Sequence, residues 1–264
     1  MKLMPVAAAV LSLSACLFAS TAATAQEVKA QGAPVHNIVL VHGAWVDGSG
    51  WKPVYDRLTK DGYHVTVVQE PLTSLEDDVA ATKRVLDQQN GPTILVAHSY
   101  GGSVITEAGV HPNVVGLVYV AAHAPAVGED ESTLGKGMPS YTSKQPGAIM
   151  KTDDGYTYLN PADFPKDFAA DLPLKEARFE SHAQMLTAAK VFSTPMTVAA
   201  WTSKPSWGIV AADDKIINPD LERWYYARAH SHTTVLAGAS HSVYESRPKE
   251  VVAVIEDAAK HTQP

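Results

Sequence analysis

The sequence predicts an α/β fold, in which a mostly parallel sheet is flanked by helices and carries an inserted cap over its carboxyl edge. Three observations lead to this prediction. Short runs rich in β-branched residues alternate with amphipathic stretches, which is typical of parallel strands joined by crossover helices. The runs are almost continuously apolar, as in strands that are covered on both faces. The alternation then breaks once, over residues 123–195.

The six apolar runs are the predicted strands, at residues 38–42, 64–69, 93–97, 114–121, 207–211 and 233–236. Between them, Ser74 is placed to cap a helix that extends through Asn90 and ends at a Gly-Pro pair. Asp77 stands three residues after the cap, a spacing like that of a capping box. Residues 219–230 and 248–261 are further predicted helices, because each begins with a proline at or near the first helical position.

The interruption at residues 123–195 is rich in Gly, Pro, Asp and aromatic residues. It lacks a strand signal and contains one predicted helix, near residues 174–190. Long insertions at the ligand-binding edge of an α/β sheet usually shape a site. We therefore expect a cap within a single domain of residues 26–264. The alternative is a long surface excursion without function.

The composition is that of a globular protein with one sizeable core. Of 264 residues, 45% are hydrophobic and 19% are charged, and the formal net charge is −7. Lysines and arginines are scattered along the chain, so no basic patch indicates a nucleic-acid partner. The sequence does not indicate an oligomeric state.

The N-terminus has the features of a signal peptide. Lys2 precedes an apolar run at residues 6–18 that is too short to cross a bilayer, and residues 23–25 form the small-x-small pattern that signal peptidase reads. We expect cleavage after Ala25 and export to the periplasm or the medium. A lipoprotein box ending at Cys16 is the alternative, which the continuation of the apolar run beyond that cysteine disfavours. No second apolar segment is long enough to span a membrane, so no membrane insertion is expected.

Residues 97–102, Ala-His-Ser-Tyr-Gly-Gly, carry the candidate nucleophile, Ser99. They follow a predicted strand and precede an apolar helical stretch, which is the context that a nucleophile elbow requires. Small residues on either side of the serine let the strand and the helix approach closely. Ala97 stands where glycine is usual, and alanine also lacks bulk.

An earlier turn at residues 41–45, Val-His-Gly-Ala-Trp, is the candidate oxyanion loop. In this arrangement the loop supplies one backbone N–H group, and the residue after the nucleophile supplies the other. The expected donors are the amides of Ala44 and Tyr100. We expect His42 to stabilise the loop, since the base in this arrangement comes last in the chain.

The candidate base is His241, which follows the last predicted strand and completes the chain order serine, acid, histidine. The acid follows the preceding strand, where Asp213 and Asp214 compete. Asp214 is favoured because the residues after it resemble the usual D-x-x-I/V-P turn, which leaves Asp213 as a loop carboxylate. His241 would then take the Ser99 proton, and Asp214 would orient the imidazole ring.

With these residues the chain resembles the α/β-hydrolase group of plant methyl-salicylate esterases, hydroxynitrile lyases and bacterial pyrethroid-hydrolase-like esterases. The resemblance covers nearly all of the mature chain and is carried by residues 41–45, 98–102, 200–207, 214–215 and 240–241. It implies the α/β-hydrolase fold and a carboxylesterase that uses neither a cofactor nor a metal. The implied partner is a small-molecule ester, often an aromatic one, bound beneath a cap.

Two departures separate the chain from the lyases of this group. The lyases carry threonine at the position of Gly43 and lysine at the position of Ser242, and the lysine stabilises departing cyanide. Esterase chemistry is therefore favoured over lyase chemistry. Perhydrolase activity on the same triad stays open, as does a ligand-binding receptor with slow turnover.

Substrate identity is not encoded in these motifs. Aromatic or heteroaromatic side chains flank the predicted site, and we expect them to contact substrate only in part, since such residues are more often core. The candidates are Trp45, Tyr100 and His123 near the sheet and Tyr156 and Phe164 in the insertion.

Overall fold

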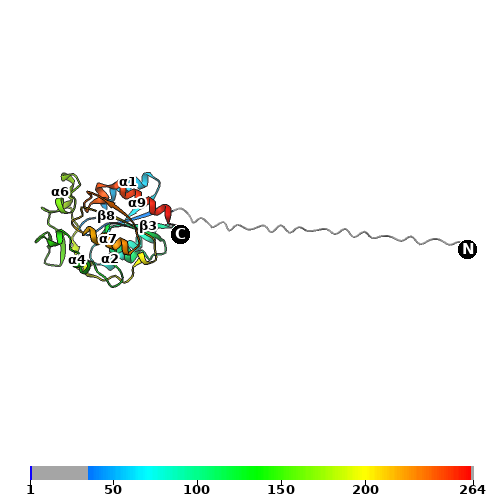
Figure 1. Ribbon diagram of the computed structural model, residues 1–264, viewed down its shortest axis with the longest axis horizontal. Coiled ribbons are helices and arrows are strands. Elements are labelled where there is room, and N and C mark those ends of the chain that lie inside the picture. The colour runs from blue at the N-terminus through cyan, green and yellow to red at the C-terminus, as the bar shows by residue number, and fades with distance from the viewer. Residues whose placement is uncertain (2–34, 263–264) are drawn as a thin grey trace. The chain divides into compact units, whose positions relative to one another are not determined.

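The computed structural model describes Met1 and residues 35–262, so the predicted signal peptide, apart from Met1, lies outside the described residues. At the centre is a six-stranded sheet (Figure 1) built from β1 (Asn37–Val41), β2 (His64–Val67), β3 (Thr93–Ser99), β4 (Val114–Ala122), β8 (Ser206–Ala211) and β9 (His232–Leu236). The strand order is β2-β1-β3-β4-β8-β9, and every neighbouring pair is parallel. The six predicted strands are confirmed to within two residues at each end.

Both faces of the sheet are buried, which explains why its strands are apolar without interruption. In β1, Ile38 and Leu40 join one hydrophobic cluster and Val39 and Val41 join the other. Figure 1 shows α1 and α9 on one side of the sheet and α2 and α7 on the other. The five long flanking helices are α1 (Lys52–Lys60), α2 (Leu75–Leu86), α3 (Gly101–Ala108), α7 (Pro219–Arg228) and α9 (Pro248–His261).

The start of α2 is as predicted, but its end is not. The Ser74 hydroxyl accepts a hydrogen bond from the Asp77 amide at 3.1 Å and donates to the Asp77 carboxylate at 2.8 Å. The helix stops at Leu86, four residues short of the predicted end, because side chains capture its last carbonyl groups. The side-chain nitrogen of Asn113, Nδ2, donates to the carbonyls of Leu86 and Gln89 at 3.0 and 3.2 Å.

The prediction that residues 123–195 lack strands is wrong. Three short strands, β5 (Ile149–Lys151), β6 (Tyr156–Leu159) and β7 (Thr187–Ala188), form a separate antiparallel sheet. Strand β6 alternates half-buried tyrosines with the buried Thr157 and Leu159, a period of two that the sequence contains. The segment also holds α4 (Glu131–Gly137), η2 (Thr142–Lys144), α5 (Phe164–Asp167), α6 (Leu174–His182) and η3 (Ala189–Ser193).

Helix α6 is also shorter than the predicted 174–190. The Gln184 side chain bonds the Leu159 amide at 2.9 Å and the Leu159 carbonyl at 2.8 Å, which ties the chain beyond His182 to β6. The remaining elements are η1 (Gly48–Trp51), η4 (Ala200–Thr202) and α8 (Val243–Ser246). Among the described residues, no helix is both long and apolar enough to cross a membrane.

The connections of the sheet determine where a site can form. After β1 the chain adds β2 on one side and then crosses to β3 on the other, so the order reverses between β1 and β3. In open parallel sheets, ligands bind outside the carboxyl ends of the strands at such a reversal. The loop after β1, which contains Ala44, and the end of β3, which contains Ser99, meet there.

Candidate active site

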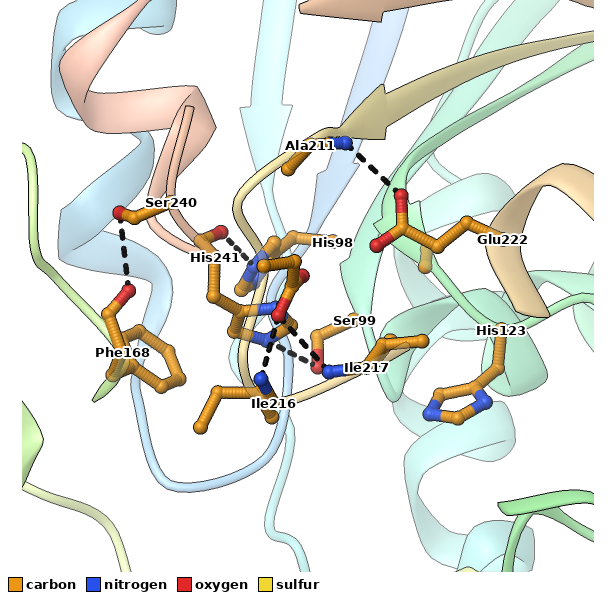
Figure 2. A network of polar contacts seen from close by, with 12 residues as sticks. His98, Ser99, His123, Phe168, Ala211, Ile216, Ile217, Glu222, Ser240 and His241 are labelled. Carbon is orange, nitrogen blue, oxygen red and sulfur yellow. Dashed lines mark hydrogen bonds and ion pairs between the residues drawn. The ribbon is translucent and has the colours of Figure 1, made fainter. Parts of the chain in front are cut away.

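Ser99, His241 and Asp214 form a continuous hydrogen-bonded chain, and Figure 2 shows Ser99 next to the His241 ring. His241 Nε2 lies 2.9 Å from Ser99 Oγ, and His241 Nδ1 lies 2.5 Å from Asp214 Oδ2. Since Nδ1 faces a carboxylate, it carries the proton of the neutral ring and leaves the Nε2 lone pair directed at the serine hydroxyl. All three residues are buried, with Ser99 5% exposed.

Ser99 occupies a strained turn at the end of β3. Its φ is +54°, a conformation that non-glycine residues rarely adopt. The turn is possible because glycine follows it: a Cβ on Gly102 would lie 2.0 Å from the His123 carbonyl oxygen. The His123 amide in turn donates to the Ser99 carbonyl at 3.2 Å. Backbone packing therefore holds the serine hydroxyl out of the strand.

The structure brings Asp214, and not its neighbour Asp213, to the imidazole ring. Asp213 is exposed, whereas Asp214 is 5% exposed. The second oxygen of Asp214 accepts hydrogen bonds from the amides of Ile216 and Ile217, at 2.7 and 2.9 Å. These amides stabilise the buried carboxylate and leave its other oxygen for His241.

A second buried carboxyl group, that of Glu222, interacts with the acid, and Figure 2 shows it beside Ala211. It accepts a hydrogen bond from the Ala211 amide at 3.1 Å. Burial, reinforced by the negative charge of Asp214, raises the pKa of Glu222 well above its usual value. The raised pKa favours the uncharged form of Glu222, which reduces the repulsion between two neighbouring buried carboxyl groups.

Hydrogen bonds on two sides hold the loop that carries His241 in place. His98 Nε2 lies 2.9 Å from the His241 carbonyl oxygen, and burial lowers the pKa of His98 well below its usual value. A neutral His98 therefore donates to that carbonyl. On the other side the Ser242 amide donates to the Phe168 carbonyl at 3.0 Å, and the Ser240 amide donates to Asp171 at 3.2 Å.

Ala44 and Tyr100, whose amides are the expected oxyanion donors, both line the cavity with Ser99. Within the part of the chain that the structure describes, neither amide donates a hydrogen bond to another protein group. Tyr100 is anchored by its side chain, whose hydroxyl donates to Asp78 at 2.7 Å. Trp45 is anchored twice, because its amide donates to Thr187 Oγ1 and its indole nitrogen to Thr157 Oγ1, each at 3.0 Å.

His42 has the structural position that the sequence predicts. It is fully buried, its Nε2 accepts from the Glu70 amide at 2.9 Å, and its Nδ1 donates to the Gly43 carbonyl at 2.9 Å. Burial lowers the pKa of His42, so the ring is neutral and connects the loop after β1 to the segment after β2.

A cavity of about 550 Å³ opens onto Ser99. Trp45, Tyr100 and His123 line it. Phe192, which the sequence analysis did not single out, lines it too and lies 5.5 Å from Trp45 between ring centroids. Two aromatic candidates from the insertion lie elsewhere. Phe164 is fully buried in a stack on Phe168, and Tyr156 packs against the hydrophobic core.

The described residues contain no group of three or more His, Cys, Asp or Glu side chains arranged to hold a metal ion. The site instead contains a hydroxyl nucleophile, an imidazole in hydrogen-bond contact with it and, among the described residues, two backbone amides without a protein acceptor in residues that line the same mostly apolar cavity. Such a set can add the serine to a carbonyl carbon and stabilise the resulting oxyanion.

Comparisons with known proteins identify the family to which the chain belongs. Residues 38–254 match the model of the alpha/beta hydrolase family. A carbendazim hydrolyzing esterase of Nocardioides sp. (strain SG-4G) is 32% identical over 124 residues, which are 41% of this chain and 51% of that protein. The chain thus aligns with about half of that relative. A pyrethroid hydrolase of Sphingobium wenxiniae is 27% identical over 257 residues, covering 85% of this chain and 88% of that protein.

Among solved structures, a methylesterase from Arabidopsis superposes with a TM-score of 0.69 at 20% identity. The match covers 86% of this chain and 99% of the plant protein, and at this identity it shows a shared fold. The pyrethroid hydrolase and the plant methylesterase both fall within the groups that the chain was expected to resemble.

Proposed function

The chain belongs to the alpha/beta hydrolase family, and we propose that it is a carboxylesterase that cleaves small hydrophobic or aromatic esters through an acyl-enzyme on Ser99. The observation that carries the proposal is the hydrogen-bonded chain from Ser99 through His241 to Asp214, which ends at an apolar cavity. Two relatives named as an esterase and a pyrethroid hydrolase support the reaction class.

In the first half-reaction, His241 Nε2 takes the proton of Ser99 as its oxygen bonds to the ester carbonyl carbon. The carbonyl electrons move onto oxygen, which the amides of Ala44 and Tyr100 stabilise. When the tetrahedral adduct collapses, the C–O bond to the alcohol breaks, and the alkoxide leaves with the proton that His241 holds. Asp214 stabilises the imidazolium and does not itself take the proton.

In the second half-reaction, water replaces the alcohol. His241 takes a proton from the water molecule as it attacks the acyl carbon, and it returns that proton to Ser99 when the acid departs. His241 therefore acts first as general base and then as general acid in each half-reaction. The products are a carboxylic acid and an alcohol.

Lyase chemistry is disfavoured at two positions. A Cβ on Gly43 would lie 2.7 Å from Ser99 Cβ, so the threonine of the lyases does not fit this backbone. Ser242 is fully buried, which leaves no solvated position for a lysine head group there. Perhydrolase activity or slow receptor-like turnover would use the same residues. The first would appear as peracid formation when hydrogen peroxide is added to the assay below, and the second as binding of the ester without release of product.

The assay measures purified protein against p-nitrophenyl esters of increasing acyl length and against methyl esters with and without an aromatic ring. We expect turnover of the short and aryl esters, together with labelling by a serine-directed fluorophosphonate. Ser99→Ala is the matched control, and it should lose both turnover and labelling. Labelling of a different serine, or turnover by Ser99→Ala, would contradict the assignment.

We also propose that residues 123–195 serve as the cap of one catalytic domain. Hydrogen bonds from Trp45 to Thr157 and Thr187 support this, since they tie the oxyanion loop to strands of that segment. Residues from the same segment also line the cavity. Replacing residues 145–160 by a short glycine linker should change the ranking of the esters in the assay, while an unchanged ranking would argue against a cap.

For the N-terminus, we propose export with cleavage after Ala25. The support is the residue pattern itself: a charged start, an apolar run and small residues at 23 and 25. Expression of the full chain in a Gram-negative host, followed by fractionation and N-terminal sequencing, should give periplasmic protein that begins at Gln26. A start at Cys16 carrying a lipid would indicate the lipoprotein route instead.

A further inference from the structure

Among the polar side chains that line the cavity, two are deeply buried, lie beside one another and are not used by the proposed ester hydrolysis. His123 follows β4, Glu131 begins α4, and both line the cavity with Ser99. Their side chains are 13% and 5% exposed. Polar groups that are buried this deeply normally have good hydrogen-bond partners in the protein.

The partners of this pair are incomplete. His123 Nε2 lies 3.4 Å from Glu131 Oε2, and His123 Nδ1 lies 3.3 Å from the Tyr225 hydroxyl. Both distances exceed the usual 2.7–3.2 Å of N–H···O bonds. Only the bond from Ser103 to Glu131 Oε1, at 2.5 Å, is short. His123 and Glu131 therefore retain hydrogen-bonding capacity on the side that faces the cavity.

The pair is also uncharged at neutral pH. Burial raises the pKa of Glu131 to about 8 and lowers the pKa of His123 to about 3. Glu131 then keeps a proton on the oxygen that Ser103 does not bond, next to a neutral imidazole nitrogen. A charged ligand group would find no counter-charge on this pair, and burying it against the pair would be costly.

A hydroxyl group satisfies both partners at once, because it donates one hydrogen bond and accepts others. Its oxygen can accept from the Glu131 carboxylic acid while its proton goes to a nitrogen of His123, or the roles can exchange. A carbonyl or ether oxygen can only accept, so it satisfies both partners in only one tautomer, the one with the proton on His123 Nε2, whereas a hydroxyl group satisfies them in either tautomer. The gap of 3.4 Å between the two side chains is compatible with one oxygen atom in hydrogen-bond reach of both.

This group would lie close to the scissile bond. The His123 amide donates to the Ser99 carbonyl, so the two residues are adjacent in space. Figure 2 shows the His123 ring on the far side of Ser99 from the His241 ring. A substrate whose carbonyl carbon meets Ser99 Oγ therefore presents its neighbouring atoms to His123.

Resting on the esterase function proposed above, we propose that His123 and Glu131 form a subsite that binds a hydroxyl group on the carbon α or β to the ester carbonyl. The substrate class is thus an uncharged hydroxy ester. The subsite recognises substrate, whereas Ser99, His241 and Asp214 perform the reaction.

The test compares two matched ester pairs. Methyl mandelate is paired with methyl phenylacetate, and methyl 3-hydroxy-3-phenylpropanoate with methyl 3-phenylpropanoate. The readout is the ratio of kcat/KM for each hydroxy ester over its deoxy partner. For wild type we expect a ratio of about 10 or more for at least one pair, the usual effect of one or two hydrogen bonds. The ratio does not depend on the absolute activity of a variant.

His123→Phe keeps a planar ring of similar size without nitrogen, and it should bring the ratio close to one. Glu131→Leu should do the same by removing the donor. Glu131→Gln keeps a donor and an acceptor without charge and should retain most of the wild-type ratio. His64→Phe, at an exposed position in β2, is the matched control and should leave the ratio at its wild-type value.

The outcomes separate the two proposals. Hydrolysis of p-nitrophenyl butyrate, measured alongside, reports esterase function alone, and its absence in wild type contradicts both the proposed function and the subsite. Wild-type ratios near one for both pairs, with p-nitrophenyl butyrate hydrolysed, contradict the subsite only. A ratio that persists in both His123→Phe and Glu131→Leu contradicts it as well. If His123→Phe does not fold, as judged by thermal melting, the two Glu131 variants decide.

Discussion

The indole nitrogen of Trp45 donates to the hydroxyl of Thr157 at 3.0 Å, which joins the loop after β1 to strand β6 of the insertion. Trp45 follows Ala44 directly and has a φ of +67°, so its backbone needs outside support. The Thr157 hydroxyl also donates to the Thr187 carbonyl at 3.0 Å. The candidate oxyanion loop therefore depends on a contact with the insertion.

Thr157→Val should lower kcat, because it keeps the shape of the side chain but leaves the Trp45 indole without an acceptor. We expect a loss of about 10-fold, smaller than the roughly 100- to 1,000-fold that follows loss of an oxyanion donor itself. Thr157→Ser keeps the hydroxyl and serves as the control. Kinetics on p-nitrophenyl butyrate check this, and an unchanged kcat in folded Thr157→Val would show that the contact does not support the loop.

Replacement of Ser99 separates chemistry from backbone strain. Both Ser99→Ala and Ser99→Gly should lose activity by about 10³-fold or more, since the nucleophile is gone. Glycine tolerates a φ of +54° and alanine does not, so Ser99→Gly should melt at a higher temperature than Ser99→Ala. In an unstrained position the order would be the reverse. Thermal melts of the two variants decide the question.

The paired acids should behave very differently. Asp214→Asn keeps the shape of the side chain but removes the charge that stabilises protonated His241, and it can favour the wrong tautomer. The corresponding change in the serine-protease triad costs about 10⁴-fold in kcat. Asp213→Asn should cost less than about 3-fold, because an exposed carboxylate is screened by solvent. Similar kcat/KM losses for two folded variants would show that neither is the acid.

Gly43 should not tolerate a side chain. A Cβ there would lie 2.7 Å from Ser99 Cβ and 3.1 Å from His98 Nδ1, so Gly43→Ala displaces the nucleophile. A misplacement of about 1 Å can reduce the rate 100-fold, and we expect a loss of this order. Gly137→Ala, where nothing lies within 4 Å, is the control. Wild type should release no cyanide from mandelonitrile at a useful rate, and rapid release by wild type would overturn the esterase assignment.

Stability should fall as pH rises from about 7 to about 9. Burial raises the pKa of Glu131 to about 8, and burial together with the charge of Glu180 raises the pKa of Glu245 to about 9. In this window the folded state holds protons that the unfolded state has lost, so stability present at lower pH is lost on passing through these pKa values. The buried histidines have lowered pKa values, so their protonation affects stability only at pH values below this range.

Melting temperatures of wild type at pH 7, 8 and 9 test this prediction, with Glu131→Gln as the comparison. The variant cannot ionise at that position, so its decrease in melting temperature should be smaller than that of wild type. A wild-type melting temperature that stays constant or rises across the range would contradict the assignment of these carboxyl groups as neutral.

Much of the fold could be predicted because its signals are local. Strands covered on both faces read as apolar runs, and Ser74 with Asp77 marks the start of α2 within a few residues. The order of Ser99, Asp214 and His241 along the chain follows from the turns that end three strands. Each of these features depends on residues that are close together in sequence.

Other features depended on contacts between distant segments. The end of α2 is determined by Asn113, and the sheet of the insertion pairs β6 with β7 across α5 and α6. The tyrosines and threonine of β6 do carry an alternating pattern, but four residues are too few to distinguish a strand from a loop.

The sequence by itself determined the parallel sheet, the turn that presents Ser99 and the pair of aspartates from which the acid had to come, because periodicity and turn chemistry act over a few residues. Only the tertiary structure decided that Asp214 faces His241 while Asp213 faces solvent. It also brought His123 together with Glu131 at the cavity wall. Burial and mutual distance, which determine charge and hydrogen bonding, exist only once the distant segments have packed together.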